Sequence, residues 1–241
     1  MEKHGKREQR KRSRRVWLWV LSAILLAALI WLIVFLVRGG IPSSDRDDSS
    51  TPADPPLVEL SDDLAIQYVS GYAGVYMEDG TNEVVSDVLM IVLENTSSQD
   101  LQLARVSIEY SNFTAEFEVT NLPAGEKVVA LEKNRHPVPS EAYRSIETRN
   151  VVFFPEAMSL QEDRIQIEGT NGALTVKNVS GADIPGDIYV YYKNSASDLL
   201  YGGITYRVAV KGGLAAGKST QVIAGHYVSG GSRIVSVDCG D

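Results

Sequence analysis

The sequence predicts an all-β protein in which two tandem antiparallel β-sandwich domains follow one N-terminal transmembrane helix. Three observations support this: one long uncharged apolar run near the N-terminus, period-2 alternation of apolar and polar residues over most of the remaining chain, and glycine-containing turn clusters between the alternating runs. The 241 residues divide into a basic tail, a transmembrane helix, a linker and two β-sandwich domains, at 1–15, 16–37, 38–57, 58–155 and 156–241.

The net charge of −8 combines two parts of opposite sign. Nine basic and two acidic residues give residues 1–38 a charge of +7, whereas 14 basic and 29 acidic residues give residues 39–241 a charge of −15. This division excludes a plain cytosolic globular protein, and the one apolar run excludes a multi-span transporter. The single cysteine excludes a disulfide-rich scaffold.

Val16–Val37 has the length and composition of a membrane-spanning helix. Its 22 residues contain no charge, proline or glycine. At ~1.5 Å per residue they reach about 33 Å, enough to cross a hydrocarbon core of ~30 Å. The positive charge before the run predicts a cytoplasmic N-terminus and an extracellular C-terminal part. Five side chains are predicted to lie at the membrane interfaces: Arg14, Arg15, Trp17, Trp19 and Trp31.

Two export signals are the alternatives to an uncleaved anchor. A cleaved signal peptide has a shorter apolar region and a small-residue cleavage site, and Arg38–Pro42 contains no such site. Ser13–Leu18 loosely resembles a twin-arginine signal. The basic tail is explained by topology or by attraction to anionic lipids. It contains no aromatic residue for stacking on bases, so no nucleic-acid partner is predicted.

Residues 39–57 are predicted to be a spacer. They are rich in Gly, Pro, Ser, Thr and Asp, a composition that buries too little apolar surface to fold alone. The acidic residues here lack the spacing of an EF-hand, so we interpret them as a solvated linker and not as a calcium site.

From residue 58 onward the period-2 pattern predicts strands with one buried face. Apolar residues occupy alternate positions in 106–110, 113–119 and 204–210. Residues 88–93 are apolar at every position, as in a central strand. Ser140–Thr148 is the one segment for which a short helix is expected.

The sequence also contains an internal repeat. Asn95-Thr96-Ser97 and Asn178-Val179-Ser180 each lead to a predicted strand, and each copy later reaches a turn glycine, Gly125 or Gly217. These glycines are 92 residues apart, which fits two domains of Ig-like size, about 100 residues each.

The repeat unit resembles the FxLYD family of bacterial envelope domains. The matching residues are Asn95, Ser97, Tyr110 and Leu122–Gly125 in the first copy, and Asn178, Ser180, Tyr191, Tyr192, Leu214 and Gly217 in the second. Ser111 and Lys193 stand where the family has Asp, and the second turn lacks the proline. The resemblance covers residues 85–132 and 172–223. It implies Ig-like sandwiches on a secreted or membrane-anchored protein and supplies no catalytic residue.

Gly212–Ser219 matches the phosphate-binding pattern G-x-x-x-x-G-K-[ST]. A P-loop continues into a helix, whereas Thr220–His226 is rich in β-branched residues and contains a glycine. The first copy has a similar turn at Leu122–Lys127, so the repeat explains the pattern. We therefore predict no nucleotide and no other cofactor.

The remaining chemistry-bearing residues form no constellation, and no catalytic or metal-binding residue is predicted. Cys239 has no second cysteine for an internal disulfide and would serve only an intermolecular one. Three histidines are isolated in the sequence: His4, His136 and His226. Three asparagines fit the N-glycosylation pattern, with a turn role as the alternative: Asn95, Asn112 and Asn178.

Tyr189 and Tyr191 are the candidate interaction residues. They share one face of a predicted strand, and exposed aromatic side chains bind proteins or sugars. The sequence predicts a non-enzymatic, membrane-anchored protein of the bacterial envelope that presents its domains for protein–protein interaction or scaffolding. The expected partners are the membrane and an unidentified envelope protein or cell-wall component. A cell-wall glycan-binding module and a sensor or regulatory subunit of a membrane complex are the alternatives.

Overall fold

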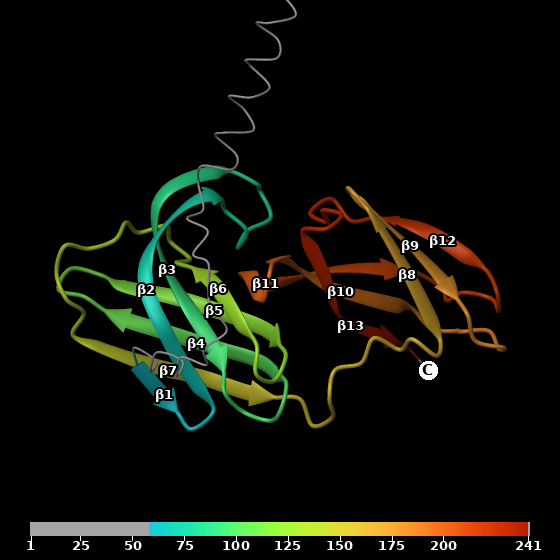
Figure 1. Ribbon diagram of the computed structural model, residues 1–241, viewed down its shortest axis with the longest axis horizontal. Helices are drawn as coiled ribbons and strands as arrows, with labels where there is room; N and C mark the ends of the chain where they lie inside the picture. Colours follow the sequence, from blue (N-terminus) through green and yellow to red (C-terminus); the bar gives the residue numbers. More distant parts are fainter. Residues whose placement is uncertain (1–57, 241) are drawn as a thin grey trace, which may run out of the picture. The chain divides into compact units, whose positions relative to one another are not determined.

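The computed structural model describes residues 58–240, and this part of the chain contains strands and no helix (Figure 1). Within these residues, 13 strands form one seven-stranded and two three-stranded sheets. The predicted all-β, sandwich-like character is thus confirmed for the described residues. The predicted tail, transmembrane helix and linker lie outside them, at 1–15, 16–37 and 38–57.

The large sheet has the order β1-β2-β3-β6-β11-β10-β13, and the two small sheets have the orders β5-β4-β7 and β12-β9-β8. The strands of the large sheet are β1 (Val58–Ser61), β2 (Leu64–Val75), β3 (Val84–Asn95), β6 (Lys127–Leu131), β11 (Leu199–Val210), β10 (Ile188–Ala196) and β13 (Ser232–Cys239). Those of the small sheets are β5 (Thr114–Leu122), β4 (Leu101–Glu109), β7 (Ser145–Phe153), β12 (Ser219–Ile223), β9 (Ala173–Asn178) and β8 (Ile165–Thr170).

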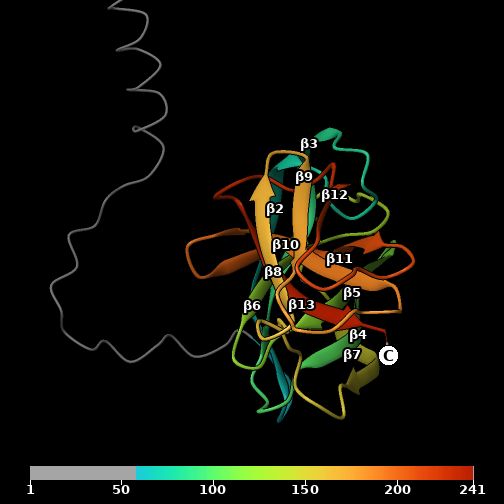
Figure 2. The same cartoon turned by 90° about the vertical axis from the view of Figure 1, so that its right-hand side faces the viewer.

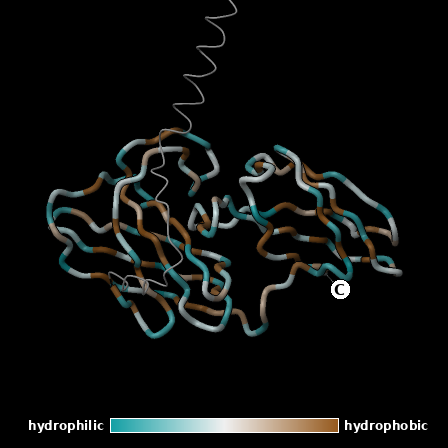
Figure 3. Tube along the Cα trace, in the orientation of Figure 1, coloured by the Kyte–Doolittle hydropathy of each residue, from teal (hydrophilic) through white to brown (hydrophobic). Residues whose placement is uncertain are grey.

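The first hydrophobic core joins residues of β2, β3 and β6 to residues of β4 and β5. Ile108, Phe117 and Val119 are buried in it, and the polar residues between them point outward. This alternation along the strands is visible in Figure 3. Residues 88–93 are buried on both faces, because Val88, Met90 and Val92 belong to a further cluster. The strand patterns predicted for these segments are confirmed.

The second core joins residues of β10, β11 and β13 to residues of β8 and β9. Leu174, Val176 and Val190 are completely buried there. Cys239 also lies in this core, opposite Ile188 in the β10–β13 register. Because its side chain is buried, Cys239 offers no exposed thiol for the intermolecular disulfide considered from the sequence.

Strand β11 connects the two halves of the large sheet. Its first residues, Leu199–Tyr201, pair in parallel with Lys127–Val129 of β6 on one side and antiparallel with β10 on the other, and its last residues continue the pairing with β10. One continuous sheet therefore contributes to both cores, and residues 58–240 belong to one compact unit. The domain boundary predicted after residue 155 falls in the connection between β7 and β8.

Both copies of the internal repeat make the same side-chain hydrogen bonds. Asn95 and Asn178 are fully buried. The amide nitrogen of each donates to the carbonyl oxygen four residues later and to a carbonyl of the Leu122 or Leu214 turn. The amide oxygen of each accepts from the N–H and hydroxyl of the serine two residues later. These two asparagines are structural and inaccessible for glycosylation, whereas Asn112 is exposed.

The turn glycines close the same motif. The N–H of Gly125 donates to the carbonyl of Asn95, and that of Gly217 to the carbonyl of Asn178. Both glycines have positive φ, +74° and +69°, which residues with a Cβ rarely adopt. The residues from Ser219 onward form strand β12 and not a helix. Gly212–Ser219 is therefore a turn of the repeat.

The short helix expected at Ser140–Thr148 is wrong. Ser145–Phe153 forms β7, which pairs antiparallel with β4 along most of its length. Ile146 packs against the first core from this strand. Tertiary pairing outweighs the local preference here, because β7 covers the side of β4 that β5 leaves open.

We predict that Asn95→Ala and Asn178→Ala each lower the free energy of unfolding by about 2 kcal/mol. Each change removes at least four side-chain hydrogen bonds of a fully buried amide, and one such bond contributes about 0.5–1.5 kcal/mol net. Urea unfolding of purified residues 54–241 measures the effect. Asn112→Ala is the matched control, since Asn112 is exposed and should change stability by less than about 0.5 kcal/mol. Equal effects of all three changes would contradict the buried role.

Candidate interaction site

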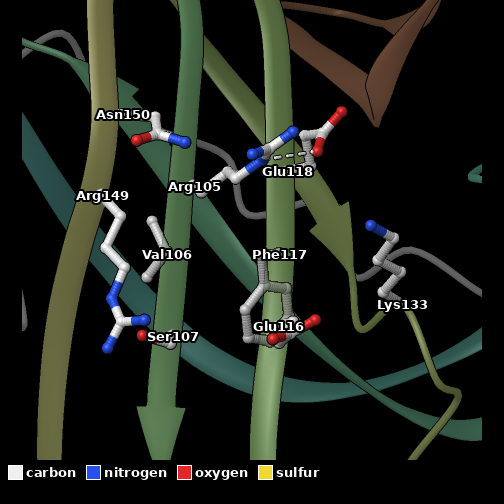
Figure 4. Close-up of a pocket in the computed structure, with 9 residues that line it drawn as sticks. All are labelled: Arg105, Val106, Ser107, Glu116, Phe117, Glu118, Lys133, Arg149 and Asn150. Atoms are coloured by element: carbon white, nitrogen blue, oxygen red, sulfur yellow. Dashed lines mark hydrogen bonds and ion pairs between the residues drawn. The ribbon is translucent and has the colours of Figure 1, made fainter.

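A polar groove of about 430 Å³ lies on the outer face of the β5-β4-β7 sheet (Figure 4). Strand β4 provides Arg105 and Ser107, and β5 provides Glu116 and Glu118. The other lining residues are Val106, Phe117, Lys133, Arg149 and Asn150. Strand alternation explains this lining, because Val106 and Phe117 point into the first core while their neighbours point outward.

The register between neighbouring strands places charged side chains of the groove directly opposite one another. Arg105 lies opposite Glu118 on one side and Arg149 on the other. Arg105 Nε is 2.9 Å from Glu118 Oε2, and Arg149 pairs with Glu147 at 3.0 Å. Two like charges directly opposite each other are destabilising in a sheet. Each of the two adjacent arginines has a carboxylate partner within the chain, which offsets this repulsion.

Lys133 adds a third cationic side chain to the groove. Its backbone N–H donates to the carbonyl of Glu116, which holds the segment after β6 beside β5. In the part of the chain that the structure describes, no ion pair engages the side chain of Lys133 or of Glu116. A partner with both acidic and basic groups would find a counter-charge for each.

The groove has the features of a binding surface and not of a reaction centre. Ser107 is its only hydroxyl side chain, and no histidine lines it to act as a base. Pockets for small molecules are mostly apolar, whereas this groove is lined largely by charged side chains. It therefore fits a polar segment of another protein.

A second group of titratable side chains consists of Lys193, on β10, and Glu78, and both bind the backbone of β11. Lys193 is fully buried, and its Nζ donates to the carbonyl oxygens of residues 202–204 at 3.0, 2.6 and 3.0 Å. The carboxylate of Glu78 accepts hydrogen bonds from the N–H groups of Gly203, Ile204 and Leu131 at 2.8, 3.0 and 2.9 Å. The two charges thus bind the same stretch of β11 through its carbonyl and amide groups.

Burial dominates the protonation of both groups. It lowers the pKa of Lys193 to about 7, and the negative charge of Glu78 opposes this shift. Burial also raises the pKa of Glu78, while its backbone hydrogen bonds lower it. Perturbed pKa values often mark catalytic sites. Here every hydrogen bond of the ammonium group goes to a backbone carbonyl, so we assign Lys193 a structural role.

The predicted interaction residues Tyr189 and Tyr191 lie on β10, away from the groove residues. The hydroxyl of Tyr189 donates to Asp187 at 3.1 Å, and the charged groups of Arg207 and Lys211 lie 5.0 Å from its ring centroid. Both tyrosines are partly buried. The residues that alternate with them are buried: Ile188, Val190 and Tyr192. Tyr189 is therefore held within a charged cluster, and the strand pattern itself is confirmed.

The other residues that the sequence singles out are separated in the structure or lie outside its described part. His136 stacks on Phe113 and His226 on Tyr206, with ring centroids 4.3 and 4.4 Å apart. Among the described residues, no group of three or more metal-ligating side chains occurs. Within residues 58–240 no helix has the length and hydropathy needed to span a bilayer. The predicted interface residues lie outside the described part: Arg14, Arg15, Trp17, Trp19 and Trp31.

The groove is not among the sites predicted from the sequence. Its signal is the alternation of charged residues in 105–109, 116–118 and 147–149, which predicts polar faces but not that these faces share one sheet.

Comparison of the chain with protein-family models, curated proteins and solved structures gives no match.

The pKa of Lys193 predicts a dependence of stability on pH. An unfolded lysine titrates near 10.4, so between about pH 7 and pH 9.5 the unfolded chain binds more protons than the folded chain. The free energy of unfolding should therefore rise with pH in this window, by at most about 1.4 kcal/mol per unit. Urea unfolding at several pH values measures the slope. Lys193→Met should remove the rise, and an equal slope in this variant would contradict the assignment.

Proposed function

We propose that the protein is a non-enzymatic, membrane-anchored component of the bacterial envelope that presents two tandem Ig-like β-sandwich domains to a partner protein. The N-terminus is cytoplasmic and the domains are extracellular. The uncharged run Val16–Val37 and the +7 and −15 charges on its two sides support this topology.

The polar groove is the observation that carries the interaction role. It combines three cationic side chains with two carboxylates on the face of a three-stranded sheet. Its base is formed by residues of the first core, so the charges stand on a well-packed support. Charged surfaces of this kind steer a partner and set its register more than they add affinity. Interaction with a polar protein segment is the function that this geometry supports best.

The contacts of β11 and β13 with the half that contains the first core support the proposal that the protein presents its domains to a partner. The hydroxyl of Thr205 donates to the carbonyl of Thr120 at 2.8 Å, and the N–H of Thr205 donates to the hydroxyl of Thr120 at 2.9 Å. Arg233 of β13 pairs with Glu126 at 3.1 Å. These bonds join the halves that contain the two cores within one compact unit.

The groove gives no support to the alternative of glycan binding. Sugar sites use exposed aromatic faces, whereas the aromatic residue of the groove, Phe117, is buried in the first core. The lining is charged and not aromatic, which favours the protein partner.

Crosslinking in native membranes, followed by mass spectrometry, tests the proposed role. We expect the full-length chain to capture one specific envelope protein. The double variant Arg149→Glu and Lys133→Glu should reduce this capture at least fivefold, because it reverses two of the three groove cations. Arg144→Glu is the matched control, since Arg144 is exposed in the same half but does not line the groove. An equal loss in both variants, or no specific capture, would refute the groove as the interaction site.

Protease treatment of intact spheroplasts tests the topology. With the N-terminus inside, protease should remove the part of the chain beyond about residue 40 while the membrane remains closed. Full protection of residues 58–241 would reject the proposed orientation, and a tag at the N-terminus should stay protected.

A further inference from the structure

Edge strands of the three sheets are the places where the described chain can accept another strand. An edge strand has backbone N–H and C=O groups without a partner, and natural proteins protect such edges with charges, bulges, proline or covering segments. In residues 58–240 the edges are β1 and β13 of the large sheet, β5 and β7 of one small sheet, and β12 and β8 of the other.

Two of these edges are covered by other parts of the chain. The N–H of Val237 in β13 donates to the carbonyl of Ser159, so the β7–β8 connection covers that edge. Thr120 of β5 exchanges hydrogen bonds with Thr205 of β11. Neither strand is available for a further pairing at these positions.

Three other edges are interrupted or shielded. Strand β1 has only four residues, includes Glu59 and contains a register shift. Strand β7 has a register shift, includes Asn150 with φ +52° and contains charged residues. On β8, the N–H of Ile165 donates to the carbonyl of Gln161, and the ring of Tyr227 lies against Gly169.

Strand β12 has none of these protections. Its sequence, Ser219-Thr220-Gln221-Val222-Ile223, contains no charge, proline or glycine. It pairs with β9 in unbroken register on one side only, at the outer edge of the β12-β9-β8 sheet (Figures 1 and 2). Ile223 is 87% exposed, the highest value among the exposed large hydrophobic residues of the described chain. An edge this regular and apolar is a site for strand pairing.

The register shows which backbone groups point outward. The N–H of Ala224 donates to Gly172, and the carbonyl of Lys218 accepts from Asn178, so the even-numbered residues of β12 bond to β9. Residues 219, 221 and 223 therefore direct their N–H and C=O groups away from β9. Their side chains are exposed as well.

We propose that β12 pairs antiparallel with β12 of a second copy of this chain, about a two-fold axis at Gln221. In this register Ser219 lies opposite Ile223 of the other copy, and Gln221 lies opposite itself. Every outward N–H then meets an outward C=O, because the odd-numbered residues of both copies face the interface. The two three-stranded sheets become one continuous six-stranded sheet, an isologous interface of the kind common in symmetric dimers.

Charge complementarity also favours a second copy. Lys177 lies opposite Ser219 in the β12–β9 register, at the first end of the strand. The other end leads to His226, whose ring is 3.1 Å from Asn82 of the β2–β3 loop. In this loop Asp79 and Glu83 share one counter-ion, Arg135, and so keep one net negative charge. Antiparallel pairing brings the basic end of each copy toward the acidic end of the other.

The pairing should be weak and reversible. Five residues from each copy form a small contact, below the roughly 1,200 Å² that stable protein interfaces bury. Confinement of two chains to one membrane would raise their effective concentration and so favour the dimer.

Thiol crosslinking of the full-length chain in native membranes tests this proposal. In the antiparallel register two Gln221→Cys residues face each other at about 5.5 Å between Cα atoms, so a short bismaleimide should produce a homodimer. Gln166→Cys is the matched control, because Gln166 is exposed on β8 of the same sheet but far from the axis. The unsubstituted chain should give no crosslink, since Cys239 is buried.

Changes of charge at Ile223 test the register. Combined with Gln221→Cys, Ile223→Lys should reduce the homodimer at least fivefold, because the new cation shares a row with Lys177 of the second copy. Ile223→Glu should keep or increase it. Both changes are at an exposed position, and an unchanged thermal midpoint confirms the fold. The groove change Arg149→Glu should leave the homodimer unchanged, which separates this proposal from the proposed function.

Three results would overturn the proposal. The first is a homodimer yield for Gln221→Cys that does not exceed that of Gln166→Cys. The second is capture of a different protein at this position in place of a second copy. The third is an equal response to Ile223→Lys and Ile223→Glu, since only the antiparallel pair places Lys177 of the second copy in the same row.

Discussion

The amino group of Lys193 binds the backbone of the irregular stretch of β11 on which the continuity of the large sheet depends. In the β10–β11 pairing, Tyr192 lies opposite Tyr206 and Asn194 opposite Tyr201, so one residue of β10 faces four of β11. Such a bulge leaves backbone groups that require partners. Lys193 binds the carbonyl groups of this bulge, and Glu78 binds its N–H groups. A buried charge is costly unless it is hydrogen-bonded and compensated. The hydrogen bonds and the charge of Glu78 offset part of this cost, and burial still lowers the pKa of Lys193 to about 7.

Strand β11 has different neighbours before and after the bulge. Before it, Leu199–Tyr201 pairs with β6 on one side and β10 on the other, whereas after it the strand continues its pairing with β10 beside the second core. Gly203 lies where the backbone of β11 comes close to the backbone of β5, because an added Cβ would meet the carbonyl oxygen of Glu118 at 2.0 Å. The most strongly perturbed lysine of the described chain thus serves the architecture. The exposed charges of the groove remain available for a partner.

Much of the fold could be predicted from period-2 alternation, because burial of one sheet face imposes that pattern directly on the sequence. The patterns around Ile108, Phe117 and Val190 predict strands that the structure confirms. The prediction for Ser140–Thr148 failed because its strand depends on a partner, β4, that lies more than 30 residues earlier in the chain. Tyr189 is predictable as an aromatic on an alternating strand, but its neighbours Arg207 and Lys211 come from β11 and the turn after it.

Residue types at short spacing are enough to establish the all-β class and the repeated Asn-x-Ser turns of the described chain, because both depend on local patterns. The groove depends on tertiary pairing, since Arg105, Glu118 and Arg149 come from three strands that meet only through register. Pairing also decides that Lys193, an ordinary charged residue in the sequence, is fully buried. The exposed edge of β12 is likewise a property of the sheet order, because a strand is an edge only when nothing pairs on its far side.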